Sequence, residues 1–313
     1  MTRRTVVLGT AVALLAVCSV FACTGSDATS SVAPDAGATG TFDSGSAPDS
    51  SSSADAAKPK PDSGTQDSGA DAGPPLPTAL GARLVLWLAA DRGFTADGVG
   101  PLVWKDQSGA GNDATQDTVA KQPARLDGSG GGVGGKPTLH FTGAEYLQIA
   151  DRASLQWSAS DFSVFCVERH TNPTTSYALL YAKWTDVPPF PGFFLWADYP
   201  TTTGFVTRLD ENNAAFSTDA GYNDETLRVV GARKHGNDLQ LFVGSTLAGE
   251  NAATTVADPA GFDAVGLPVY LGGRPAGIQM LQGDISEVVA VKGTLTDAEM
   301  TNLQAYLKAK YSL

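Results

Sequence analysis

The chain has 313 residues, of which only 17% are charged, and it contains 35 glycines and 18 prolines. This composition favours turns and strands over long helices. The formal net charge is −12 at pH 7. Because nucleic-acid binding depends on clustered Lys and Arg, and the acidic chain has no such cluster, we do not expect a nucleic-acid partner.

The first 22 residues have the organisation of a secretory signal. Arg3 and Arg4 precede an apolar run at residues 6–22, and small residues follow. The run is short for a membrane span, which needs about 20 apolar residues. We therefore predict that residues 1–22 are a signal peptide, with an uncleaved anchor as the alternative.

The signal ends in Val-Phe-Ala-Cys at residues 20–23. This tetrapeptide resembles the lipobox of bacterial lipoproteins, which implies cleavage before Cys23 and acylation of both its thiol and its new amine, with palmitate as one such chain. Several acyl chains make a membrane attachment stable. Thr24, rather than Asp, follows the cysteine. By the same resemblance, this favours the outer membrane of a Gram-negative cell.

Residues 23–77 consist mainly of Ser, Ala, Asp, Gly, Pro and Thr, with almost no large apolar side chain. Such a segment cannot bury enough apolar surface to offset the entropy lost on ordering. Repulsion among its aspartates extends it further. The composition predicts a disordered tether, with a glycosylated stalk as an alternative.

From residue 78 the composition changes, and short apolar runs alternate with turn residues. The run at 83–88 is apolar on both faces, as a central strand of a packed sandwich would be. Further strand-like runs lie at 101–105, 138–141, 146–149, 162–169, 177–184, 193–196, 204–209, 227–232, 239–243 and 269–271. Many short strands and a single late helix leave no room for βαβ units. We predict one all-β domain, an antiparallel sandwich over residues 78–313.

The chain ends in a strand, a turn and a helix. Residues 285–291 are largely β-branched, which suits a buried strand. Thr296 and Glu299 then have the spacing of a capping box, in which each side chain binds the other residue's amide. Apolar residues recur at helical spacing beyond them, and they predict a helix that packs one stripe inward: Met300, Leu303, Leu307 and Tyr311.

Glu287 is unusual within that strand. By alternation it should point the same way as Ile285, Val289 and Val291. A carboxylate among apolar neighbours must be hydrogen-bonded, paired or neutral. We expect a structural role for Glu287, with a buried hydroxyl, amide or Arg as its partner. Asp284, three residues earlier, is expected on the opposite face.

Several motifs occur in a recognisable order. Residues 84–91 are Leu-Val-Leu-Trp-Leu-Ala-Ala-Asp, residues 104–114 are Trp-Lys-Asp-Gln-Ser-Gly-Ala-Gly-Asn-Asp-Ala, and residues 136–143 are Lys-Pro-Thr-Leu-His-Phe-Thr-Gly. With the strand–turn–helix ending, they resemble the bacterial LamG-like jellyroll domains of the concanavalin A-like lectin/glucanase group. The resemblance covers essentially residues 79–313. It implies a concanavalin A-like antiparallel jelly roll that ends in a short helix.

The loop at 106–113 is rich in oxygen ligands. Asp106, Asn112 and Asp113, with Ser108, could wrap a calcium ion, which takes six to eight oxygens. The alternative is that these side chains bind their own backbone and hold a tight turn. Compared with relatives of the group, the chain also lacks two rim carboxylates, which weighs against calcium.

Residues 183–199 are rich in aromatic side chains and proline. Sugars stack on exposed aromatic rings while polar groups bind their hydroxyls. We expect Trp184 and Phe190 to be the exposed rings, with Asp186 and Asp198 as the polar groups. The alternative assigns the aromatic residues to the core.

Nothing in the sequence points to catalysis. The paired-carboxylate pattern Glu-x-Asp-x-x-Glu of the glucanases is absent, as are other hydrolase motifs, and the three histidines are scattered. Cys166 lies in an apolar run and is expected to be a buried small hydrophobe. We expect a non-enzymatic, lipid-anchored surface module that binds a carbohydrate or a surface protein. A polysaccharide hydrolase and a structural or adhesion domain are the alternatives.

Overall fold

The computed structural model describes residues 78–313 except 97, 158–159, 172–176, 200–203, 220, 253 and 256–261. The predicted signal peptide, Cys23 and the tether at 23–77 therefore lie outside the described residues. Within the described part of the chain, no helix combines the length and apolar character that crossing a membrane requires.

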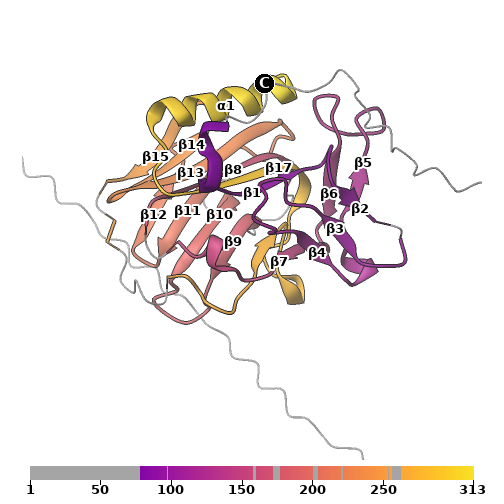
Figure 1. The fold of residues 1–313 in the computed structure, drawn as a ribbon, viewed down its shortest axis with the longest axis horizontal. Helices are drawn as coiled ribbons and strands as arrows, with labels where there is room; N and C mark the ends of the chain where they lie inside the picture. Colours follow the sequence, from indigo (N-terminus) through magenta and orange to yellow (C-terminus); the bar gives the residue numbers. More distant parts are fainter. Residues whose placement is uncertain are drawn as a thin grey trace, which may run out of the picture. The chain divides into compact units, whose positions relative to one another are not determined.

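Two antiparallel sheets form a β-sandwich (Figure 1), which confirms the predicted all-β fold class. The first sheet has 8 strands, with β1 beside β17. In spatial order its strands are β15 (Thr246–Asn251), β14 (Asp238–Val243), β13 (Arg228–His235), β8 (Phe162–His170), β17 (Gln282–Lys292), β6 (Thr138–Thr142) and β5 (Ala124–Leu126), with β1 (Leu84–Ala89) on β17.

The second sheet has 9 strands. In spatial order they are β12 (Asn213–Phe216), β11 (Gly204–Asp210), β10 (Gly192–Tyr199), β9 (Ala178–Trp184), β16 (Val269–Leu271), β7 (Leu147–Ile149), β4 (Ala114–Gln116), β3 (Leu102–Trp104) and β2 (Phe94–Thr95). Short 3-10 helices are η1 (Thr78–Arg83), η2 (Val119–Lys121), η3 (Ala153–Leu155) and η4 (Pro275–Gly277), and the one α-helix of the described chain is α1 (Asp297–Tyr311).

The main core lies between the sheets and follows strand alternation. Phe193 and Leu195 of β10 point into it, as do Val164 and Cys166 of β8. Cys166 is a free, fully buried thiol, as the sequence predicted. Its burial, together with the nearby Glu168 carboxylate, raises its pKa, so this cysteine is a packing residue rather than a nucleophile.

The outer face of the first sheet is covered by α1 (Figure 1). All four residues of the predicted apolar stripe are buried there, against β8, β13 and β17. Both halves of the capping box are formed: the Thr296 hydroxyl accepts from the Glu299 amide at 3.2 Å, and Glu299 accepts from the Thr296 amide at 2.9 Å. The Arg83 guanidinium also binds Glu299 and so ties the start of the helix to η1.

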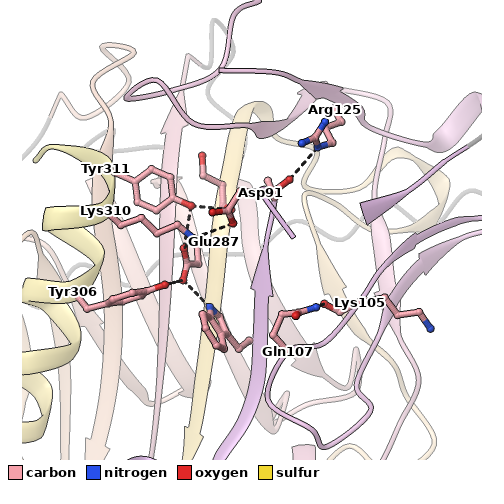
Figure 2. Close-up of polar contacts among 11 residues, drawn as sticks. Asp91, Lys105, Gln107, Arg125, Glu287, Tyr306, Lys310 and Tyr311 are labelled. Atoms are coloured by element: carbon pink, nitrogen blue, oxygen red, sulfur yellow. Dashed lines mark hydrogen bonds and ion pairs between the residues drawn. The ribbon is translucent and has the colours of Figure 1, made fainter. Parts of the chain in front are cut away.

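Glu287 is fully buried beneath this helix (Figure 2). Its Oε1 accepts from the Trp87 indole at 2.7 Å and the Tyr306 hydroxyl at 3.1 Å. Its Oε2 accepts from Lys310 Nζ at 2.8 Å and the Tyr311 hydroxyl at 3.0 Å. Four donors occupy the roughly four lone-pair positions of a carboxylate. Glu287 is therefore a structural residue that binds the helix to the sheet, with Lys and Trp partners that the sequence did not reveal.

The predicted alternation of side chains along β17 is wrong around Ile285, which does not point the same way as Glu287. A register shift lies between Ile285 and Glu287, so Ile285 packs in the inter-sheet core while Glu287 lies on the helix side with Val289. A β-bulge resets alternation because it inserts one extra residue. Asp284, which flanks Ile285, thus lies on the same outer face as Glu287 rather than on the opposite one.

Candidate functional site

The outer face of the second sheet carries a row of aromatic side chains. Phe194 and Trp196 of β10 lie on this face because Phe193 and Leu195 point inward. Their rings are stacked, with centroids 3.6 Å apart and planes 9° from parallel. Tyr177 packs on Trp196 at 4.5 Å. Among the described residues, this face has no helix over it comparable to α1.

A groove of about 260 Å³ runs over these rings. Its lining residues come from the approach to β9 and from β10, β11, the β11–β12 turn and β12: Tyr177, Phe194, Trp196, Val206, Arg208, Glu211, Asn212, Ala214 and Phe216. Phe216 is 46% exposed, which is unusual for so large an apolar side chain. Phe194 and Trp196, which are 2% and 7% exposed, lie beneath the groove, and Phe216 presents the exposed ring. An Arg, a Glu and an Asn complete the lining. We call this the aromatic groove.

Two arginines lie against the same aromatic row. The Arg208 guanidinium lies 5.6 Å from the Phe190 ring centroid and 5.4 Å from that of Phe194. The Arg274 guanidinium lies only 4.1 Å from the Trp184 centroid. Such contacts orient the cation over the ring face.

The structure shows how the residues of the predicted sugar platform are placed, and it does not test whether they bind a sugar. Trp184 is 7% exposed and lies under Arg274, so the expectation of an exposed ring is wrong. Asp186 is on the surface, but both its oxygens accept from Arg274, at 2.8 and 2.6 Å, and this pairing lowers the pKa of the Asp186 carboxyl. Phe190 is half-buried beside Arg208. Asp198 belongs to β10, but its side chain lies outside the described residues.

Comparison with protein-family models finds no match, and comparison with curated proteins finds none either. Among solved structures, the binding domain of botulinum neurotoxin serotype D/C is similar with a TM-score of 0.50 at 10% identity, covering 73% of this chain and 53% of that one. Trypanosoma rangeli sialidase in complex with sialic acid has a TM-score of 0.49 at 15% identity, covering 77% and 35%. The binding domain of Paraclostridial Mosquitocidal Protein 1 has a TM-score of 0.48 at 13% identity, covering 72% of this chain and 52% of that one. The chain spans from about a third to half of these proteins, and at such identities the likeness concerns the fold alone.

The loop at 106–113 forms the hydrogen-bonded turn rather than an open ion cradle. Asp106 accepts from the amides of Trp87, Ser108 and Asn112, each at 2.9 Å, and from the Ser108 hydroxyl at 2.7 Å. Asp113 accepts from the Asp106 amide and from Lys105, at 2.9 and 2.7 Å. Four donors therefore occupy the lone-pair positions of the Asp106 carboxylate, and two donors bind the Asp113 carboxylate.

Asn112 is equally committed, because its amide nitrogen donates to the Val85 carbonyl at 2.6 Å and to the Ser154 hydroxyl at 2.9 Å. In the described part of the chain, no three His, Cys, Asp or Glu side chains converge as metal ligands would. These hydrogen bonds favour the alternative to the calcium hypothesis for Asp106, Asn112 and Asp113, a structural turn that anchors β1 to the loop.

Sequence reasoning missed most of the groove. Arg208 and Phe216 lie on strands, and Glu211 and Asn212 lie in the turn between them. A usable signal was present in residues 205–209, Phe-Val-Thr-Arg-Leu, where a charged residue alternates with apolar ones and so marks an outward face. Tyr177 had no comparable signal, because its contact with Trp196 depends on the pairing of β9 with β10.

Proposed function

We propose that this protein is a glycan-binding surface module that uses the aromatic groove. The supporting observation is a set of stacked rings, with polar groups at the rim, on a sheet face that no described helix covers. The apolar faces of sugar rings stack on aromatic side chains, while Arg, Asn and Glu bind hydroxyl groups. A volume below the usual 300–1,000 Å³ of drug-sized pockets suits a short glycan segment.

Binding in the groove is proposed to be non-catalytic. Glycoside hydrolysis generally uses two carboxyl groups that flank the scissile bond. Among the described residues that line the groove, Glu211 is the one carboxylate. The glycan is therefore expected to leave the groove unchanged.

The proposal includes the resemblance to LamG-like jellyroll domains and the attachment of the module to a cell surface. The motifs at 84–91, 104–114 and 136–143 support the first, and the lipobox-like sequence before Cys23 supports the second. Metabolic labelling with palmitate tests the anchor: label should enter the native chain and be lost with Cys23→Ser. Equal labelling of both chains would remove Cys23 as the lipidation site, and surface exposure to added protease would test the outer-membrane placement.

The groove is tested with a glycan array probed with the full chain. Phe216→Ala should weaken binding about tenfold, because stacking of one exposed ring contributes roughly 1–1.5 kcal/mol. Trp196→Ala should also weaken binding, because it removes the support beneath the groove. Leu247→Ala is a matched control, since Leu247 is also 46% exposed but lies on β15. Folding of each variant is checked by near-UV circular dichroism. If no glycan binds, or if Phe216→Ala and Leu247→Ala bind alike, the groove is not the site and a structural or protein-adhesion role takes its place.

A further inference from the structure

A second concave site lies away from the aromatic row, at one end of the first sheet. There β6 and β8 end beside the start of β17, and a hollow of about 420 Å³ opens between their last residues. In the strand register, Asp284 of β17 lies between His140 of β6 and Arg169 of β8. Three neighbouring strands thus place three ionisable side chains side by side across the sheet.

Asp284 holds the other two side chains in place. Its carboxylate is 2% exposed, and its Oδ1 lies 3.0 Å from His140 Nδ1. Its Oδ2 accepts from Arg169 Nε at 2.7 Å and from Nη2 at 2.5 Å. Because an ionised carboxylate can only accept, the contact places a hydrogen on His140 Nδ1, which leaves Nε2 as the ring nitrogen available to a ligand.

His140 remains accessible while it is held. Its side chain is 38% exposed, whereas the Asp284 carboxylate behind it is buried. The second histidine of the hollow is fixed in a similar way, since His170 Nδ1 lies 2.6 Å from Glu168 Oε2 and both side chains are fully buried. Side chains fixed by buried partners offer hydrogen-bonding positions at little entropic cost.

The charges of the hollow limit what it can take. Arg169 and Asp284 neutralise each other, and Glu225 adds a negative charge, so an anion is disfavoured. No three metal-type ligands converge in the described chain, so the hollow offers no cage for a cation. The rest of its wall is mainly polar, with Thr142, Thr171 and Gln282, so an apolar ligand is also disfavoured. What fits is a neutral group that both donates and accepts hydrogen bonds.

We propose that this hollow is a second saccharide-binding site, distinct in chemistry from the aromatic groove and independent of it. A sugar hydroxyl donates to His140 Nε2, while Arg169 and the Gln282 amide donate to neighbouring hydroxyl oxygens. With its two sites on different sheets, the module could hold two stretches of one polysaccharide, and the linked sites would gain avidity from effective concentration.

The experiment uses the small number of histidines in the full chain, His140, His170 and His235. The ring carbon–proton NMR signals are assigned with His140→Ala and His235→Ala, on protein carrying a histidine-free tag. The probes are glucose, galactose, mannose, xylose and N-acetylglucosamine, followed by their short oligomers. At least one probe should shift the His140 signal in a saturable way while leaving the exposed hairpin residue His235 unmoved.

Two variants separate this site from the groove. Trp196→Ala should keep the His140 shift, because the groove is not involved. His140→Ala should weaken binding of the same probe, measured by calorimetry in the Trp196→Ala background, by about three- to tenfold, the effect of one hydrogen bond. Gln282→Ala, which leaves the Asp284 contacts intact, should also weaken it.

The proposal is overturned if no probe moves the His140 signal, or if the shift disappears in Trp196→Ala. It is also overturned if affinity is unchanged in both His140→Ala and Gln282→Ala. Loss of the shift in Trp196→Ala would assign the probe to the groove instead, whereas the other results leave groove binding to be read from Phe216→Ala on the array.

Discussion

The two sheets differ in how their outer faces are completed. The outer face of the first sheet is apolar and is covered by α1, whose apolar stripe packs against it. Beneath the helix, four hydrogen-bond donors surround the Glu287 carboxylate. The outer face of the second sheet is also apolar, but in the described chain no helix like α1 lies over it; its own packed rings, Arg208 and Arg274 complete it. We call the first the closed face and the second the open face, which is the face of the proposed binding site.

The largest expected effect is on the closed face. Glu287→Gln removes the buried charge that faces Lys310 and should lower the free energy of unfolding by about 2 kcal/mol, because Lys310 then keeps only Asp91, at 3.0 Å, as its counter-charge. Urea unfolding measures this. Glu250→Gln, on the exposed edge strand β15, is the control and should be near neutral. A loss below about 0.5 kcal/mol for Glu287→Gln would mean that the carboxylate does not bind the helix.

Alkaline pH should also weaken the closed face. Burial, and then the Glu287 charge, raise the pKa values of Tyr306 and Tyr311. A raised pKa means that the folded state keeps its protons when the unfolded state loses them, so stability is full below about pH 10 and falls above it. Each tyrosine adds up to about 1.4 kcal/mol per pH unit to that fall. In Tyr311→Phe, the free energy of unfolding should fall less steeply between about pH 10 and 11 than in the native protein. If the two proteins lost stability in parallel, ionisation of Tyr311 would not be coupled to folding.

The capping box allows a smaller test within the same helix. Thr296→Ala should cost about 1 kcal/mol, since it removes the acceptor for the Glu299 amide. Thr301→Ala changes the same residue type inside the helix, where the hydroxyl merely donates to the Asp297 carbonyl, and should cost less. Equal losses in thermal unfolding would show that the cap contributes nothing specific.

The smallest stability effect is expected on the open face. Arg274→Ala removes a cation–ring contact and an ion pair whose Asp186 side chain is 66% exposed. Such groups contribute about 0.5–1 kcal/mol. Trp184 fluorescence should respond more than stability does, because the ring loses its cover. If Arg274→Ala destabilised the protein as much as Glu287→Gln, the two faces would not differ in the way described.

Much of the fold could be predicted from sequence because it depends on local patterns. The strand runs, the capping box and the helix stripe follow alternation and spacing within a few residues. Exposure could not be predicted in this way: Trp184 is covered by Arg274, 90 positions further along the chain. The bulge in β17 was equally hidden, because it is visible only in the pairing with β8. The groove could not be predicted from local patterns alone, because its rings come from the approach to β9, from β10 and from β12, and its polar residues come from β11 and the turn after it.

The position of β17 has a consequence for how the molecule is made. This strand lies inside the first sheet, paired with β8, β6 and β1, although it is the last strand of the described chain. Its pairing with β1 joins positions about 200 apart, such as Trp87 and Val289. A sheet of such high contact order folds slowly and cannot close before β17 has been synthesised. Strands β1, β6 and β8 therefore lack their central partner until residues 282–292 are available.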